Sequence, residues 1–220
     1  RFVDHLAHES RTPLTSIIGY AELLQKVDYD PALFQKGLNY IYSEGKRMLN
    51  LNNMLLDLTF YREKNFELCL QPVLPICREV QELTAVRAAE RNISIEVCGE
   101  ELVLPLEKDL LKSLLLNLVD NAMKASPDGS SIIIGTQKQQ QEKILYVQDF
   151  GRGMEAKELK KIKEPFYRVD KARSRKDGGV GLGLAICNQI ASTLQGRLTY
   201  ESQPQKGTIA KIYFTDEVKS

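Results

Sequence analysis

The stretch NLVDNAMKAS, residues 117–126, lies within an apolar-periodic run that predicts a helix from about Lys108 to Ala125. Asn117 and Asn121 are four residues apart and therefore share one face of this helix, with Lys124 one turn further on. Two carboxamide oxygens on one face suit a hard cation such as Mg²⁺, and a lysine beside them suits a phosphate. A polar helix face exposed to solvent is the alternative interpretation.

A second polar motif ends the apolar run KILYVQD, residues 143–149, which predicts a strand. In this motif, DFGRGM, Gly151 and Gly153 would allow the backbone to pass close to a flat ligand. Asp149 is placed to accept a hydrogen bond from an exocyclic amine at the mouth of an apolar pocket. A simple strand-to-loop turn accounts equally well for this motif on its own.

The segment EPFYRVDKARSRKDG, residues 164–178, is dense in arginine and lysine. It predicts a loop that is anchored by Phe166 and Tyr167 and that leaves Arg168 facing solvent. A lid that offers guanidinium groups to phosphates is one interpretation of this loop. An ordinary solvated loop is the other.

The segment GGVGLGLAI, residues 178–186, precedes a predicted helix from about Leu182 to Leu194. Its glycines Gly179, Gly181 and Gly183 would turn free backbone N–H groups, at the positive end of the helix dipole, toward an anion. The segment matches neither a P-loop nor a dinucleotide fingerprint, and alone it is a weak signal.

Upstream of these motifs the sequence predicts two amphipathic helices joined by a turn. Asp30 is expected to cap the second helix, and Pro31 to occupy its first position. Apolar residues recur at spacings of three and four in both helices: Val3, Ala7, Leu14, Ile17, Ile18, Ala21 and Leu24, then Phe34, Leu38, Ile41, Met48 and Leu55. A hairpin cannot bury both stripes alone, so we expect pairing with a second copy into a four-helix bundle.

The first helix carries HESRTPL, residues 8–14. His8 lies one residue past the apolar stripe, so its side chain should point about 100° away from it, on the outer face. Glu9 places a carboxylate beside an imidazole that must be partly deprotonated to act as a nucleophile. Pro13 is expected to kink the helix, and His5 to be a surface residue. A solvated helix surface is the alternative for the His8–Glu9 pair.

Together and in this order, the four downstream motifs resemble the N, G1, F and G2 boxes of the ATP-binding domain shared by sensor histidine kinases. FVDHLAHESRTPL, residues 2–14, resembles the H box of the same family's dimerisation and phosphotransfer domain. The resemblance covers essentially the whole chain. It implies an all-α helical hairpin for residues 1–62, forming a four-helix bundle as a dimer. Residues 66–220 would then form an α/β two-layer sandwich of the histidine-kinase/gyrase-type ATP-binding fold.

The resemblance also implies an activity. ATP would phosphorylate His8, and the phosphoryl group would pass to an aspartate of a response-regulator receiver domain, with phosphatase activity toward that regulator. Glu9 would take the imidazole proton, and Thr12 would orient a water for dephosphorylation. The implied nucleotide and metal roles are Asn121 and Asn117 for Mg²⁺, Lys124 and Arg168 for phosphates, Asp149 for the adenine amine, Gly151 and Gly153 in the G1 box, and Gly179, Gly181 and Gly183 for the polyphosphate.

Two other readings compete with this one. The ATPases of type II topoisomerases, mismatch-repair proteins and heat-shock chaperones share the ATP fold, but they carry a glutamate four residues before the Mg²⁺-binding asparagine. Asn117 occupies that position here, and the hairpin with His8 has no counterpart in those proteins. The second alternative is a module that dimerises and binds nucleotide without transferring phosphate. The complete set of motif residues argues against it.

Composition and cysteine spacing limit the classes of partner and the cellular compartment that we expect for this chain. Thirty basic and twenty-nine acidic residues give a net charge of +1. This balance lacks the excess of basic charge that is typical of proteins that bind nucleic acids. The four cysteines form no C-x-x-C pair, which argues against a zinc site or a disulfide framework. No apolar run approaches the ~20 residues that cross a bilayer, and no signal peptide is evident. Together with the resemblance to sensor histidine kinases, this leads us to expect the cytoplasmic portion of a membrane-anchored sensor, with any membrane segment outside this sequence.

Overall fold

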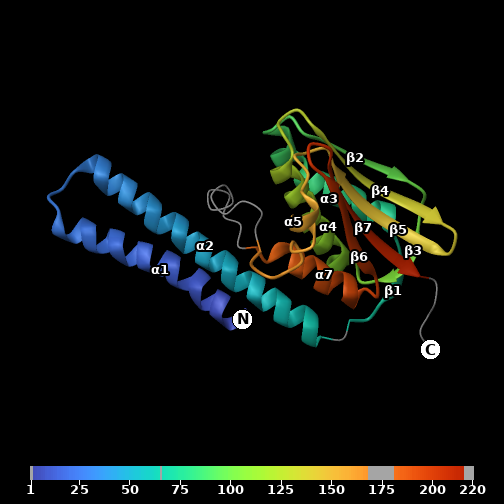
Figure 1. Cartoon of the computed structure of the whole chain (residues 1–220), viewed down its shortest axis with the longest axis horizontal. Helices are drawn as coiled ribbons and strands as arrows, with labels where there is room; N and C mark the ends of the chain where they lie inside the picture. The colour runs from blue at the N-terminus through green and yellow to red at the C-terminus, as the bar shows by residue number, and fades with distance from the viewer. Residues whose placement is uncertain (1, 65, 168–180, 216–220) are drawn as a thin grey trace. The chain divides into compact units, whose positions relative to one another are not determined.

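A computed structural model describes residues 2–64, 66–167 and 181–215. The chain divides into two compact units, Arg1–Thr59 with Pro165–Leu182 and Phe60–Glu164 with Gly183–Ser220. The first unit contains α1 (Phe2–Lys26) and most of α2 (Pro31–Glu63) (Figure 1). The second contains β1 (Cys69–Pro72), α3 (Val73–Ala89), β2 (Ser94–Gly99), β3 (Val103–Leu106), α4 (Lys108–Ala125), β4 (Ser131–Gln139), β5 (Glu142–Asp149), α5 (Ala156–Leu159), α7 (Gly183–Thr193), β6 (Arg197–Gln203) and β7 (Gly207–Thr215).

The first unit is the predicted helical hairpin. The Asp30 carboxylate accepts a hydrogen bond from the Ala32 backbone N–H at 3.0 Å, so it caps α2 as expected. Near the turn the helices approach closely. This is clear at Gly37, where an added Cβ atom would lie only 2.9 Å from the Leu24 side chain. The rings of Tyr20 and Tyr40 stack with centroids 4.6 Å apart. These contacts hold α1 antiparallel to α2.

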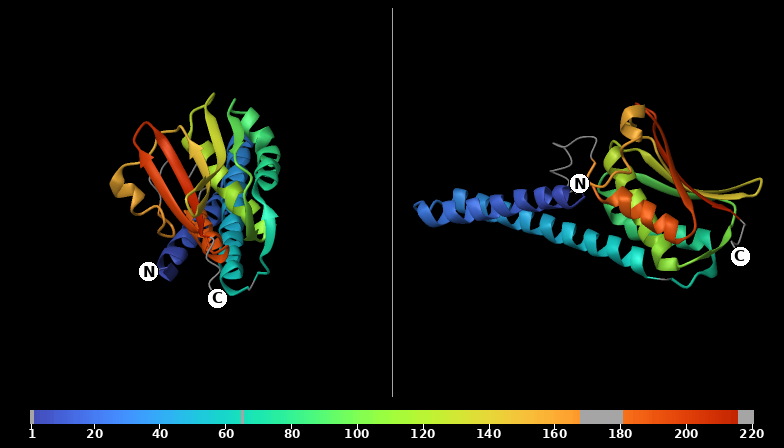
Figure 2. Two further views of the ribbon diagram at one scale, coloured as in Figure 1. Left: turned by 90° about the vertical axis from the view of Figure 1, so that its right-hand side faces the viewer. Right: turned by 60° about the horizontal axis from the view of Figure 1, so that its bottom comes forward.

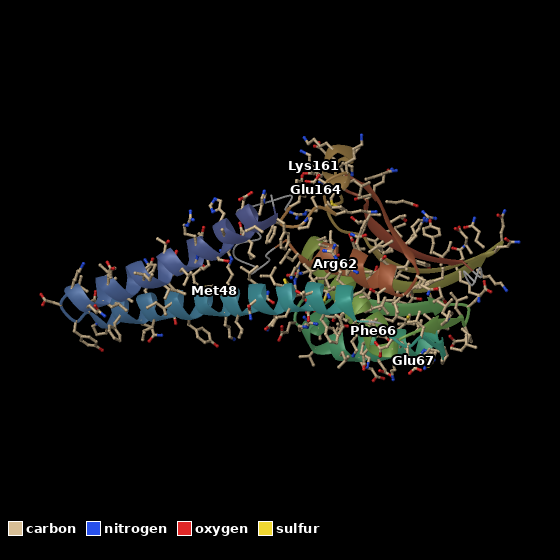
Figure 3. The ribbon with its side chains drawn as sticks, turned by 90° about the horizontal axis from the view of Figure 1, so that it is seen from below. Met48, Arg62, Phe66, Glu67, Lys161 and Glu164 are labelled. Carbon is tan, nitrogen blue, oxygen red and sulfur yellow. The ribbon has the colours of Figure 1, made fainter. Side chains whose placement is uncertain are left out.

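The hairpin leaves about half of its described apolar side chains exposed to solvent. Leu14 is 44% exposed, Ile18 55% and Leu38 44%, while Met48 on α2 is half-buried (Figure 3). Among the described side chains of α1 and α2, the buried residues are Pro13, Gly37 and Leu51. Ala7, which was also predicted on the apolar stripe, is exposed in the hairpin and lies beside His8 on α1. None of the described helices is both long enough and apolar enough to span a bilayer.

Replacing Leu38 and Ile41 together with glutamate is expected to convert the chain from a dimer to a monomer. Each charge would otherwise have to be buried in an apolar bundle interface, at a large desolvation cost. The matched control adds the same two charges to the polar side of α2, at Gln35 and Asn39, whose side chains hydrogen-bond to each other at 3.2 Å. Light scattering should find the control dimeric. A dimer mass for the Leu38/Ile41 variant would contradict the bundle.

The second unit is built on a mixed five-stranded sheet in the order β2-β4-β5-β7-β6. Strand β2 runs parallel to β4, and the remaining neighbours are antiparallel. Helices α3, α4 and α7 pack on one face (Figure 2), which confirms the predicted arrangement of a hairpin followed by a two-layer α/β domain. Strands β1 and β3 form a separate two-stranded sheet, which the sequence pattern did not distinguish from the main one.

Helix α4 is the centre of this unit. Its first turn is capped by Glu107, whose carboxylate accepts from the backbone N–H groups of Asp109 and Leu110. The face toward the sheet is apolar, with Leu111, Leu114 and Leu115 completely buried. At its other end the Arg91 guanidinium donates to the carbonyls of Met123 at 2.5 Å and Ser126 at 2.9 Å. Both ends of α4 are therefore held, and its polar edge is positioned rigidly.

Candidate functional site

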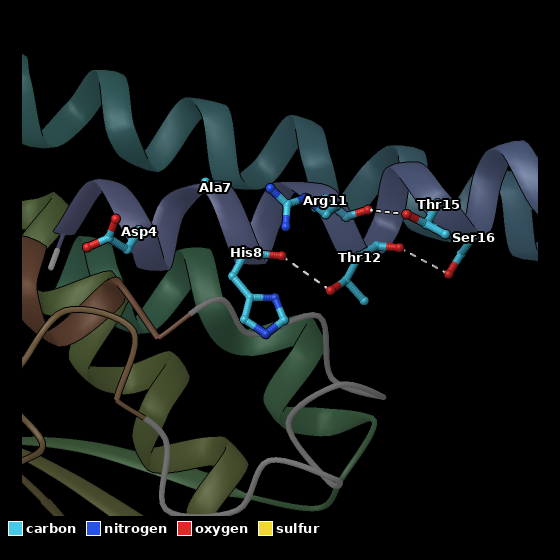
Figure 4. Close-up of a pocket in the computed structure, with 7 residues that line it drawn as sticks. All are labelled: Asp4, Ala7, His8, Arg11, Thr12, Thr15 and Ser16. Atoms are coloured by element: carbon cyan, nitrogen blue, oxygen red, sulfur yellow. Dashed lines mark hydrogen bonds between the residues drawn. The ribbon is translucent and has the colours of Figure 1, made fainter.

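The exposed face of α1 displays His8. Helical periodicity places seven residues on this face: Asp4, Ala7, His8, Arg11, Thr12, Thr15 and Ser16. The imidazole projects away from the axis of α1 (Figure 4). His8 is exposed, as predicted from its place beside the stripe. A reactant can therefore approach its ring.

Thr12 lies one turn after His8 on the same face. Its hydroxyl donates to the His8 backbone carbonyl at 3.2 Å, and Ser16 repeats the pattern onto the Thr12 carbonyl at 3.2 Å (Figure 4). Such bonds to the preceding turn are common for hydroxyl residues inside helices. The bond uses the hydroxyl proton of Thr12 and leaves its oxygen able to accept from a water.

Glu9 is turned away from this face, toward α2. Its Oε2 accepts a hydrogen bond from Nη2 of Arg47 at 2.9 Å. The Arg47 side chain is only 9% exposed and that of Glu9 is 30% exposed, so the ion pair is partly shielded from solvent, and it bridges the two helices. Pro13, which was expected to kink the helix, lies buried inside a continuous α1.

The polar edge of α4 brings two predicted residues to the beginning of α7. Nδ2 of Asn117 donates to the Ser113 carbonyl at 2.9 Å, which leaves Oδ1 facing Gly183. A Cβ atom at Gly183 would lie 3.7 Å from Oδ1 of Asn117 and 3.9 Å from Nδ2 of Asn121. Both amides thus face the first residue of α7, where backbone N–H groups are free of helical partners.

This arrangement fits a hard cation held partly by phosphate. The oriented Oδ1 of Asn117 is a ligand of the type that Mg²⁺ accepts, and Asn121 offers a second amide beside it. Within the described ranges no group of three His, Cys, Asp or Glu side chains is suited to a metal ion. A cation here would therefore complete its shell with phosphate oxygens and water. Lys124 is exposed in the last turn of α4.

Asp149 ends β5 and is only 6% exposed. Burial raises the pKa of its carboxyl group, and hydrogen bonds from the backbone N–H groups of Gly151 and Thr208 oppose that rise. Both N–H groups donate to Oδ1, at 2.9 Å and 3.2 Å. Among the described residues no donor reaches Oδ2, so this oxygen is available to a ligand amine.

Gly151 and Gly153 are glycines for a reason that differs from the predicted one. A Cβ atom at Gly151 would overlap the backbone carbonyl of Ala125, and one at Gly153, where φ is +62°, would overlap the carbonyl of Gln203. The close approach in the structure is therefore to the protein's own backbone. Contact of these two glycines with a ligand stays a prediction.

The other glycine-rich segment is described only in part. Arg168 and Gly179 lie outside the described residues. Gly181 has φ of +82°, and its carbonyl accepts from the Phe166 backbone N–H at 2.8 Å. The positive φ accounts for glycine at this position.

Two residues that hold the predicted ones in place, Thr208 and Arg47, were not predicted from the sequence. Thr208 acts on Asp149 through its backbone N–H alone, so no side-chain pattern pointed to it. Arg47 lies 38 residues from Glu9 in sequence. The sequence feature that could have pointed to Arg47 is its place directly before Met48, a residue of the apolar stripe.

Family comparisons divide the chain in the same order as its motifs. Residues 1–62 match the His Kinase A (phospho-acceptor) domain, and residues 107–218 match the family described as histidine kinase-, DNA gyrase B-, and HSP90-like ATPase. The chain belongs to the sensor histidine kinases. His8 lies in the segment matched by the phospho-acceptor domain, and Asn117, Asn121 and Asp149 lie in the segment matched by the ATPase family.

Individual histidine kinases agree with this assignment. Sensor histidine kinase YkoH of Bacillus subtilis is 33% identical over 220 residues, which cover 99% of this chain and 48% of YkoH. The structure of histidine kinase ThkA in complex with response regulator protein TrrA shares the fold, with a TM-score of 0.79 at 22% identity over 98% of this chain and 61% of that one. Full-length ShkA in complex with AMPPNP gives a TM-score of 0.66 at 25% identity, over 94% and 44% of the two chains. The chain spans 35% to 49% of the length of the curated relatives that it matches first.

Proposed function

We propose that this chain uses ATP to phosphorylate His8 and passes the phosphoryl group to an aspartate of a response-regulator receiver domain. The observation that carries the proposal is the solvent-exposed imidazole of His8 in a phospho-acceptor segment, on the same chain as a unit of ATPase type. In that unit the buried Asp149 uses Oδ1 for both of its backbone donors, and its Oδ2 would accept from the exocyclic amine of adenine. Full-length ShkA, which has the same fold, was solved with the ATP analogue AMPPNP.

The proposed chemistry is a nucleophilic displacement at phosphorus. The unprotonated ring nitrogen of His8 attacks the γ-phosphorus, the bond to the β-phosphate oxygen breaks, and ADP leaves with that electron pair. Glu9 takes the proton of the other ring nitrogen, so that the phosphohistidine is left without a ring charge. Phosphoryl transfer depends mostly on positioning and on neutralising phosphate charge.

That neutralisation is assigned to the second unit. Asn121 and Asn117 would hold Mg²⁺, which when bound supplies positive charge to the phosphates. Lys124 would add a point charge, and the N–H groups at the beginning of α7 would face the polyphosphate chain. Arg168 is proposed, from the family resemblance, to meet the γ-phosphate.

The proposed partners are a second copy of the chain and a receiver domain. The exposed stripes of the hairpin support the first. The second is supported by ThkA, which was solved with the response regulator TrrA. We further propose that the chain works in the cytoplasm as part of a membrane-anchored sensor. The names of its relatives, which are sensor histidine kinases, support its place in a sensor.

The experiment that tests this function is incubation of the full chain with Mg²⁺ and ATP labelled at the γ-phosphate. Label should enter the protein, survive alkali and be lost in acid, because a phosphorus–nitrogen bond is stable in base and labile in acid. Adding receiver domains should then move the label to one of them. Protein that stays unlabelled, or label that survives acid, would contradict the proposal.

Thr12→Ala is expected to keep phosphorylation of His8 and to lose most phosphatase activity toward a phosphorylated receiver domain. Autophosphorylation needs a nucleophile and a base, whereas dephosphorylation needs mainly a positioned water, and the Thr12 oxygen is free to accept from one. Decay of a pre-phosphorylated receiver measures the second activity. Thr15→Ala, which removes an equivalent hydroxyl bonded to the Arg11 carbonyl at 2.9 Å, is the matched control. Equal loss of both activities in Thr12→Ala would mean that Thr12 only supports the helix.

A further inference from the structure

The guanidinium of Arg47 lies between two carboxylates of the first unit. Nη2 donates to Oε2 of Glu9 at 2.9 Å, and Nη1 lies 3.6 Å from Oε2 of Glu44, one turn earlier on α2. Oε2 of Glu44 is buried and has no hydrogen-bond partner in the described part of the chain. One cation therefore serves two partly buried anions, and it satisfies one of them incompletely.

The pair with Arg47 separates Glu9 from His8. A base must come within about 2.6–3.2 Å of the proton donor, or act through one water. Successive residues on a helix project about 100° apart, and the carboxylate of Glu9 is engaged on the side of α2. The described residues show no hydrogen bond between Glu9 and the His8 ring, while the other residues around His8 all come from its own exposed face.

We propose that Arg47 is a positioning residue for phosphoryl transfer at His8. Paired with Glu9, it withholds the base from the imidazole. When Arg47 moves onto Glu44, Glu9 is released and can take the imidazole proton as His8 attacks the γ-phosphorus and ADP leaves. Arg47 keeps a carboxylate partner in both arrangements, so neither strands a buried cation. The proposal rests on the proposed function, because it takes His8 as acceptor and Glu9 as base.

Arg47→Met removes the charge and keeps most of the aliphatic stem that packs between the helices. In the full chain it is expected to raise kcat of autophosphorylation about three- to fivefold, the population shift that an ion pair of this kind can sustain. KM for ATP should not change, because nucleotide binds the other unit. Arg47→Lys keeps the charge and should stay near the original rate. Lys46→Met, an exposed neighbour on α2, is the matched control and should also leave the rate unchanged.

Two further variants separate positioning from a purely structural role. Glu44→Gln removes the competing anion and should lower kcat by a similar factor, because Arg47 then stays on Glu9. In a Glu9→Gln background, Arg47→Met should give no gain over the residual rate. A gain that persists without Glu9, a higher rate in Glu44→Gln, or a slower Arg47→Met protein of unchanged dimer mass would each overturn the proposal.

The outcomes remain distinct if one variant fails. Should Arg47→Met fail to fold as a dimer, the sign of the effect of Glu44→Gln decides alone. Failure of the proposed function itself would appear as an unlabelled original chain. Failure of the Arg47 proposal would appear as a labelled chain whose variants move in the wrong direction.

Discussion

His8→Gln is expected to abolish incorporation of labelled phosphate from ATP. The imidazole is the proposed nucleophile, and the glutamine amide, whose nitrogen lone pair is delocalised into its carbonyl, cannot replace it. The substitution should leave the fold intact because His8 is exposed and its described side-chain surroundings are those of an open helix face. Counting label on the purified full chain after incubation with Mg²⁺ and ATP measures the effect. ATP affinity, measured by calorimetry, should stay unchanged.

The second histidine provides the control for this result. His5 is also exposed on α1, three residues earlier, so His5→Gln should keep the label. If the His8→Gln protein retained label and His5 proved to be the labelled residue, the acceptor would have been assigned wrongly. Loss of label in both variants would instead mean that these substitutions disturb the structure of the first turns of α1.

Asp149→Asn is expected to weaken ATP binding by about 1–3 kcal/mol, or roughly 5- to 150-fold in Kd, the usual cost of spoiling a hydrogen bond that involves a charge. The amide keeps an Oδ1 acceptor for the N–H groups of Gly151 and Thr208. It replaces Oδ2 with an NH₂ donor, which would face the donor amine of adenine. Recognition is therefore lost while the local backbone contacts persist. Calorimetry on the full chain measures the change.

The melting temperature separates this effect from unfolding. Because burial raises the pKa of Asp149, the folded protein binds that proton more tightly than the unfolded chain does. The carboxylate therefore costs stability as the pH rises past its unfolded and then its folded pKa, and a neutral amide removes that cost at pH 7. We expect Asp149→Asn to melt no lower than the original chain. Asp128→Asn, an exposed carboxylate paired with Arg91 at 2.7 Å, should leave ATP affinity unchanged, and unaltered affinity in Asp149→Asn would remove this residue from the site.

The sequence predicted best those features that depend on neighbouring residues. Helix α4 has the predicted bounds, Lys108 to Ala125. They were predictable because the apolar repeat of a helix relates residues only three or four positions apart. The cap at Asp30 is equally local. The pairing of β1 (Cys69–Pro72) with β3 in a separate small sheet was not predicted. Pairing with a distant strand, rather than local propensity, decides where a strand begins and ends.

By itself the sequence determined the hairpin, the mixed α/β unit, the order of the motifs and the exposure of His8, since periodicity and capping act over four residues or fewer. Only the tertiary structure decided the partner of Glu9, because Arg47 reaches it from a second helix after the chain has turned back. It also decided that Gly151 and Gly153 face the protein's own backbone, and that both N–H groups holding Asp149 bind Oδ1. Such contacts join segments far apart in the chain. Their geometry follows from how helices and strands pack, which no local pattern of residues records.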